Sequence, residues 1–146
     1  MAQSKNADNK ESIDLPTQII YEGSCHCKAA SFSVKLPSLL SQLTVISCNC
    51  SYCHIAGSLL TFVGDVEIYQ GASSLKEYRF GSHSIQIFFC GTCGANVYNK
   101  SLNPKFRYGE HAVNVRLLHG IDLETIEITK ADGKRVQLPP LGEGPL

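Results

Sequence analysis

Seven cysteines in three short clusters are the residues of this chain best suited to chemistry. They form the patterns Cys25-x-Cys27, Cys48-x-Cys50-x-x-Cys53 and Cys90-x-x-Cys93. Such short spacings bring thiolate sulfurs to one tetrahedral centre, which is how many proteins bind Zn²⁺. Seven sulfurs divide into a closed set of four, which would hold a fold together, and an open set of three, which would leave a position for water or substrate.

The first and last clusters are predicted to share a structural zinc. The Cys90-x-x-Cys93-Gly94 segment resembles half of a zinc ribbon, which requires a second pair of sulfurs. Cys25 and Cys27 are the matching pair, far away in sequence but able to meet it across a sheet. An ion that links such remote positions closes a long loop and would contribute strongly to folding.

The middle cluster is compact enough to hold a second ion alone. Cys48, Cys50 and Cys53 lie within one short loop, which cannot easily supply a fourth ligand. The alternative is that a histidine closes the site and makes it structural. The distant candidates for that role are His83, His111 and His119.

Two other uses of the cysteines are disfavoured. An odd number of cysteines leaves one unpaired, and Cys-x-Cys partners are poorly placed to form a disulfide with each other. The common iron–sulfur clusters need four cysteines, so a division into four and three suits two zinc ions better. We therefore expect two Zn²⁺ per chain.

A zinc bound by three thiolates would favour a particular chemistry. The thiolates more than neutralise the charge of the ion, so it is a weaker Lewis acid than one held by three histidines. It suits a soft fourth ligand such as a substrate thiol, which it would deprotonate. A thiolate held beside an electrophilic carbon can make or break a carbon–sulfur bond. The open position could also polarise an aldehyde oxygen.

Composition limits the partners of the chain. The 146 residues are 43% hydrophobic and 18% charged, as in ordinary globular proteins. Thirteen basic and thirteen acidic residues cancel, so we expect neither nucleic acid nor an anionic membrane as a partner. No apolar run approaches the ~20 residues of a membrane-spanning helix. Residues 1–15 lack a secretory signal, so the expected location is the cytoplasm.

The elements that must position the cysteines are predicted to be short strands. Alternating β-branched and aromatic residues with regular glycines indicate an all-β sandwich or a partly open barrel. Residues 37–42 and 117–125 could supply helical turns, and 104–109 a loop. We expect tails at 1–15 and 136–146 around one domain at 16–135. The predicted strands are 18–21, 30–35, 43–47, 59–63, 66–69, 75–80, 85–89, 95–98 and 112–117.

The order of these motifs resembles the glutathione-dependent formaldehyde-activating enzyme family, which shares its domain with centromere protein V. The resemblance covers about residues 18–130 and includes Gly57-Ser58 after the triple, Phe89 before Cys90 and the 113–116 stretch Val-Asn-Val-Arg. It implies an Mss4-like zinc-containing β fold. It also implies a structural zinc at Cys25, Cys27, Cys90 and Cys93, and a catalytic zinc at Cys48, Cys50 and Cys53.

The resemblance also implies an activity, namely carbon–sulfur lyase chemistry on glutathione and a small aldehyde such as formaldehyde. Where many relatives have Arg or Lys after the triple, this chain has His54, for which we predict a role as a proton shuttle. Lys105, Arg107 and Arg116 are candidates to meet glutathione carboxylates. The alternatives are a non-catalytic zinc-stabilised binding module and a glutathione carrier that binds the thiol without accelerating a reaction.

Overall fold

The protein is built almost entirely from short strands. The structure, a computed structural model, describes residues 18–141, so the predicted tail at 1–15 lies outside the described residues. None of the described helices is long and apolar enough to cross a membrane. The strands are β1 (Ile19–Ser24), β2 (Ser31–Leu36), β3 (Val45–Cys48), β4 (Leu60–Val63), β5 (Val66–Gln70), β6 (Leu75–Tyr78), β7 (Ile85–Cys90), β8 (Asn96–Ser101), β9 (His111–Asn114) and β10 (Ile128–Ala131), and the one α-helix of the described chain is α1 (Ser51–Ala56).

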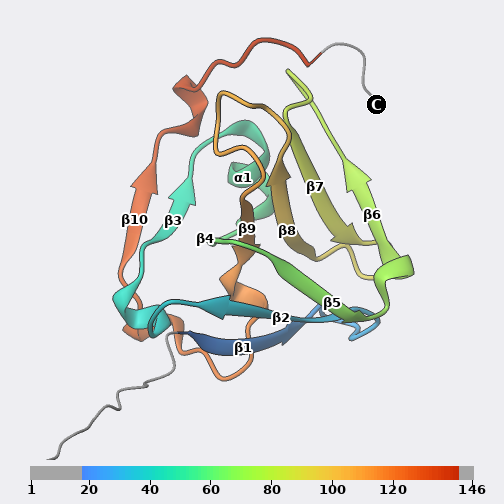
Figure 1. The fold of residues 1–146 in the computed structure, drawn as a ribbon, viewed down its shortest axis with the longest axis vertical. Coiled ribbons are helices and arrows are strands. Elements are labelled where there is room, and N and C mark those ends of the chain that lie inside the picture. The colour runs from blue at the N-terminus through green and yellow to red at the C-terminus, as the bar shows by residue number, and fades with distance from the viewer. Residues whose placement is uncertain (1–17, 142–146) are drawn as a thin grey trace, which may run out of the picture.

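The strands form two open sheets (Figure 1). The smaller has the order β1-β2-β5, and the larger has the order β10-β3-β4-β9-β8-β7-β6. All neighbours are antiparallel except β10 and β3, which are parallel. In Figure 1 the two edges of the large sheet, β10 and β6, lie on opposite sides of the view, and α1 lies between them. The all-β prediction is confirmed, and the sheets do not close into a barrel.

The main core lies between the two sheets. The inward residues of β2, Phe32, Val34 and Leu36, are at most 1% exposed. They pack with Val97 of β8 and Val113 of β9, so the apolar face of the alternating pattern is covered by the large sheet. Cys25 and Cys90 belong to this core, whereas Cys53 belongs to a smaller apolar cluster with Leu60 and Ala112.

Buried asparagines fix the end of the large sheet next to α1. The side chain of Asn114 accepts from the N–H of Leu59 at 3.3 Å and donates to the carbonyl of Asn96 at 2.9 Å. The amide of Asn96 accepts in turn from the Ser58 hydroxyl at 2.7 Å. A buried polar network is stabilising only when its members are paired, as these are. The network anchors the chain where it leaves α1.

Most predicted elements are confirmed, with two additions. Each of the nine predicted strands is present within a few residues, although 115–117 forms a 3₁₀ turn instead of continuing β9. The predicted helical regions contain the 3₁₀ turns Leu40–Gln42 and Leu123–Thr125, and 104–109 contains no helix or strand. The segment that holds the cysteine triple was predicted as a loop but contains α1, and β10 was not predicted.

The C-terminal strap, residues 132–141, crosses the open side of the large sheet. In Figure 1 it runs from the end of β10 over α1 toward the turn between β7 and β6. The N–H of Leu141 donates to the carbonyl of Ser82 in that turn, at 3.1 Å. Within the strap a 3₁₀ turn spans Gly133–Arg135, and residues 136–141 contain no helix or strand. The strap therefore connects the two edges of the sheet above α1.

Candidate metal centres and the adjoining cavity

The four cysteines assigned to one ion meet as predicted. Cys25 and Cys27 follow β1, and Cys90 ends β7 with Cys93 in the next turn. Their sulfurs all lie within 4.8 Å of one another. The Sγ atoms of Cys25 and Cys27, and of Cys27 and Cys90, are 3.7 Å apart. Four sulfurs at ~2.3 Å from a tetrahedral zinc would be about 3.8 Å apart, so these two distances fit the ion.

Backbone N–H groups point at sulfurs of this cluster and stabilise negative charge on them. The N–H groups of Thr92 and Cys93 point at Cys90 Sγ at 3.3 and 3.5 Å, and that of Ala30 points at Cys25 Sγ at 3.4 Å. The N–H of Cys93 is the main reason that the pKa of Cys90 is lowered to about 6. Gly94, at φ 82°, allows the tight turn that aims these groups. These N–H groups therefore favour the thiolate of Cys90, the form that binds metal.

The cysteine triple also converges, at the start of α1. Cys48 ends β3, Cys50 is the N-cap residue of α1 and Cys53 lies in its first turn. The three sulfurs lie within 4.8 Å of one another. The N–H groups of Cys50 and Cys53 point at Cys48 Sγ and Cys50 Sγ, each at 3.4 Å. The helix that sequence analysis missed is thus the element that gathers the triple.

The triple has no fourth ligand from the described chain. Across residues 18–141, no histidine or carboxylate joins the three sulfurs within 4.8 Å. Of the predicted distant candidates, His111 lies 3.2 Å from the Gly64 carbonyl and His119 lies 3.0 Å from the Ser24 hydroxyl. His83 is also outside the group. The donor set is soft and compact, so it fits zinc with one coordination position left open.

Two thiols of the triple, those of Cys48 and Cys53, have pKa values raised above that of an ordinary cysteine. Burial raises the pKa of Cys53, and the neighbouring Cys50 adds to the rise. Burial also raises the pKa of Cys48, although the N–H groups of Cys50 and Gly133 oppose the change. Metal binding here must displace these protons.

The C-terminal strap holds the triple from outside. The Asn49 side chain donates to Asp132 at 2.8 Å and accepts from the N–H of Lys134 at 2.9 Å. Gly133 lies directly against Cys48, where an added Cβ would overlap Sγ. Sequence analysis placed none of these residues at the site. A glycine at position 133 is the one hint of this contact in the sequence. It could not be interpreted there, because the sequence does not show that Cys48 lies beside Gly133.

A cavity of about 540 Å³ adjoins the triple. Its lining residues come from the strap, from α1 and from strands β3, β4, β7, β8 and β9 of the large sheet. Cys48, Cys50 and Cys53 form part of its wall. The remaining wall is largely apolar and includes Ile46, Tyr52, Phe62, Phe80, Ile87, Phe106, Val136 and Leu138. A substrate in this cavity would lie beside the open position of the triple.

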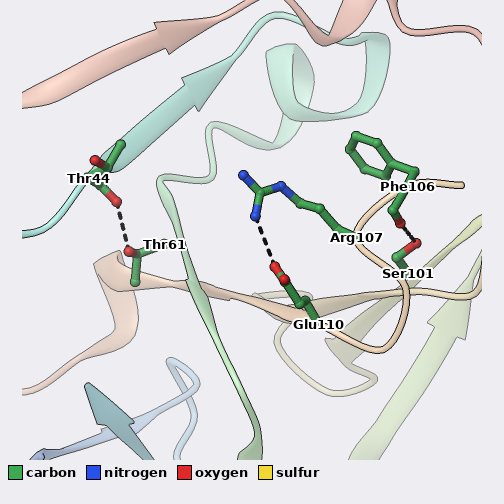
Figure 2. Close-up of polar contacts among 6 residues, drawn as sticks. All are labelled: Thr44, Thr61, Ser101, Phe106, Arg107 and Glu110. Atoms are coloured by element: carbon green, nitrogen blue, oxygen red, sulfur yellow. Dashed lines mark hydrogen bonds and ion pairs between the residues drawn. The ribbon is translucent and has the colours of Figure 1, made fainter. Parts of the chain in front are cut away.

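Arg107 lies at the cavity and is held by two contacts, of which Figure 2 shows the one with Glu110. Its guanidinium donates to Glu110 at 2.9 Å and lies 3.6 Å from the centre of the Phe62 ring. The adjoining loop is fixed because the Ser101 hydroxyl donates to the Phe106 carbonyl. Elsewhere in the sheet the Thr61 hydroxyl donates to the Thr44 carbonyl at 2.8 Å and so connects β4 to the start of β3. Arg107 is therefore positioned to meet an anionic group.

The other predicted polar residues lie elsewhere. His54 is exposed on α1 and does not line the cavity, so its role as a proton shuttle stays a prediction. Lys105 is exposed outside the lining, and Arg116 donates to the Gly57 carbonyl at 2.9 Å. Lys100, which sequence analysis did not single out, does line the cavity. Of the three predicted carboxylate partners, only Arg107 reaches it.

Comparison with known proteins agrees with this geometry. The crystal structure of a Rhodobacter sphaeroides protein, determined by a structural genomics effort, is similar to the chain with a TM-score of 0.65 and 27% identity. The match covers 75% of this chain and 99% of the other. A family model described as glutathione-dependent formaldehyde-activating enzyme matches residues 20–120, which include all seven cysteines. The chain belongs to the glutathione-dependent formaldehyde-activating enzyme family.

Proposed function

We propose that this protein is a zinc-dependent carbon–sulfur lyase and synthase that acts on glutathione adducts of aldehydes. The observation that carries the proposal is the convergence of three cysteine sulfurs at a cavity, with no fourth ligand from residues 18–141. The four-cysteine cluster has no such opening, because its ligand set is complete. We assign Cys25, Cys27, Cys90 and Cys93 to a structural zinc and Cys48, Cys50 and Cys53 to a catalytic zinc.

The proposed reaction is the reversible addition of a thiol to a carbonyl. The sulfur forms a bond to the carbonyl carbon, the C=O π electrons move to oxygen, and the thiol proton ends on that oxygen. The reverse reaction cleaves the carbon–sulfur bond and regenerates thiol and aldehyde. A zinc ion held by the triple would supply acidification of the incoming thiol.

The residues of the cavity would bind and orient the substrate. Arg107 and Lys100 line it, and glutathione carries two carboxylates at pH 7. The contacts of Arg107 with Glu110 and Phe62 reduce the freedom that a flexible side chain would lose on binding. A substrate that fills the largely apolar cavity would displace water and so strengthen its ionic contacts. Holding thiol and aldehyde side by side would lower the barrier to addition.

The test is NMR exchange spectroscopy of glutathione, formaldehyde and S-hydroxymethylglutathione with the zinc-loaded protein. Exchange should be faster than in buffer, and Cys50→Ser should reduce the acceleration more than about 100-fold, because even outer-sphere partners of a metal contribute 10–100-fold. Ser51→Ala is the matched control, since Ser51 is exposed, adjacent and outside the cavity lining.

Two results would contradict the proposal. Binding of glutathione without faster exchange, for formaldehyde and larger aldehydes alike, would indicate a carrier. Full activity of Cys50→Ser would remove the catalytic role of the triple. A zinc content of two per chain, with one ion readily removed by a chelator, is expected for the active protein.

A further inference from the structure

The cavity offers far more apolar surface than a one-carbon aldehyde can use. Its volume of about 540 Å³ lies in the range that encloses ligands of drug size. The polar side chains described above, Lys100, Arg107 and Glu110, come from β8 and the loop that follows it. Other elements contribute mainly apolar groups, so the cavity has room for a second, uncharged part of a ligand.

Apolar side chains of α1, of the segment after β6 and of the strap line the same cavity as the triple. Tyr52 of α1 and Phe80, which follows β6, have ring centres 6.3 Å apart with an interplanar angle of 28°. Val136 and Leu138 of the strap line the same cavity. Val136 is 46% exposed. Because exposed apolar surface is unfavourable in water, an apolar ligand group that covered this side chain would gain binding free energy.

The strap lies outside the residues that the family model matches. The family match ends at residue 120, whereas Val136 and Leu138 follow it by more than a dozen residues. Two contacts described above fix the strap: Asn49 binds its start, and Ser82 binds its end. Its apolar side chains are therefore held at the cavity by contacts at both ends of the strap.

We propose that the cavity binds thiol adducts of aldehydes that carry an apolar, preferably aromatic, substituent, and that Val136 and Leu138 of the strap select for it. This inference rests on the proposed function and names its class of electrophile. The substituent lies against Tyr52 and Phe80 on one side and the strap on the other. The thiol and the carbonyl carbon then face the triple, and they react by the same reversible addition of sulfur to carbon.

Binding of stable thioethers tests the proposal independently of turnover. S-methylglutathione and S-benzylglutathione have no free thiol, so isothermal titration with the zinc-loaded protein reports the apolar contact. The benzyl compound should bind at least about tenfold more tightly, as expected when a phenyl ring leaves water. The Val136→Ser/Leu138→Ser double variant should reduce this ratio to about two or less.

The matched control is Ile55→Ser, which also removes an exposed apolar side chain near the triple. Ile55 is 84% exposed and does not line the cavity, so the tenfold ratio should persist. Equal affinities in the wild-type protein, no binding of either compound, or an unchanged ratio in the double variant would overturn the proposal.

Exchange rates separate this inference from the proposed function. With glutathione, phenylacetaldehyde should give a higher kcat/KM than formaldehyde in the wild-type protein, and the double variant should reverse the order. Catalysis of formaldehyde addition without benzyl preference would overturn the apolar subsite alone. Benzyl preference with no catalysis for any aldehyde would overturn the proposed function and leave the apolar subsite supported.

Discussion

The two cysteine clusters use the same ligand type for different structural purposes. The four-cysteine cluster joins two segments more than sixty residues apart, and Cys25 and Cys90 are at most 1% exposed. The triple takes its sulfurs from six consecutive residues, 48–53, and opens onto a cavity. The first connects the end of β1 in the small sheet with the end of β7 in the large sheet, whereas the second links only β3 to α1.

This difference indicates what each cluster contributes. A metal that closes a long loop stabilises the whole fold, while one that closes a six-residue loop adds little to it. The triple is held instead by protein contacts, namely the cap of α1 and the strap. Its geometry therefore does not depend on the ion alone, and one coordination position can be left for substrate.

The largest expected effect is the loss of the four-cysteine ion. Cys93→Ser should leave the protein unfolded or molten at 25 °C, since a structural zinc contributes ~10–16 kcal/mol in small zinc domains and a whole fold has only about 5–15 kcal/mol. Circular dichroism and zinc content measure the outcome. Cys50→Ser, by contrast, should retain a cooperative melting transition. If both variants unfold, or neither does, the distinction between the clusters is wrong.

A smaller effect is expected when the strap is pushed away from the triple. Gly133→Ala places a methyl group against Cys48 Sγ, so the affinity of the triple for zinc should fall about 10–100-fold, the range seen when groups around a metal site are disturbed. A chelator competition assay measures this change.

Gly64→Ala provides the control for the strap variant. No atom outside the adjoining residues lies within 4 Å of a Cβ at Gly64, and its backbone angle is not in the left-handed region. Its zinc affinity should equal that of the wild-type protein. An equal loss in both variants, or none in Gly133→Ala, would show that contact with the strap does not position Cys48.

Falling pH should release the ion of the triple before that of the four-cysteine cluster. Metal binds the thiolate, and the raised pKa values of Cys53 and Cys48 mean that protons compete there already at higher pH. In the other cluster the first thiolate forms at Cys90, with a pKa of about 6. The pKa of Cys27 in that cluster is raised to about 11. The Ala29 N–H acts to lower this pKa, but removal from water and the Cys90 and Cys25 thiols favour the protonated form.

Zinc release measured with a chromophoric chelator between pH 8 and 4 should therefore show two steps. Circular dichroism should stay native through the first step and be lost in the second. A single step, or loss of structure with the first ion, would contradict the assignment of the weaker site to the triple.

The sequence predicted the parts of this site that depend on short-range spacing. The Cys-x-x-Cys spacing brings Cys90 and Cys93 together independently of the rest of the fold. Alternation of apolar residues predicts strands such as β2 and β7. The pairing of Cys25 and Cys27 with them also followed from ligand number. The cysteine spacings and the alternation are encoded locally, so each segment of the sequence was sufficient to predict them.

The features that sequence analysis missed depend on partners distant in the chain. β10 is a strand because β3 offers parallel backbone partners, and its Ile-Thr-Lys-Ala sequence has no distinctive pattern. The strap was predicted as a tail because proline and glycine are frequent after residue 138, yet Val136 and Leu138 line the cavity. Neither feature has a local signal, since tertiary contacts determine both.

The smallest effect is expected at His54, the one predicted catalytic residue outside the cavity lining. General acid–base catalysis contributes 10²–10⁴-fold, so a true proton shuttle should lose at least a hundredfold in His54→Ala and change the pH dependence of the exchange rate. Because the side chain is exposed on α1, away from the cavity wall, we expect a loss below about tenfold and an unchanged pH profile. His26→Ala, at an exposed histidine beside the four-cysteine cluster, is the matched control. A hundredfold loss confined to His54→Ala would contradict this expectation. It would mean that α1 turns His54 toward the substrate during turnover, so that the cavity gains a lining residue that it lacks in this structure.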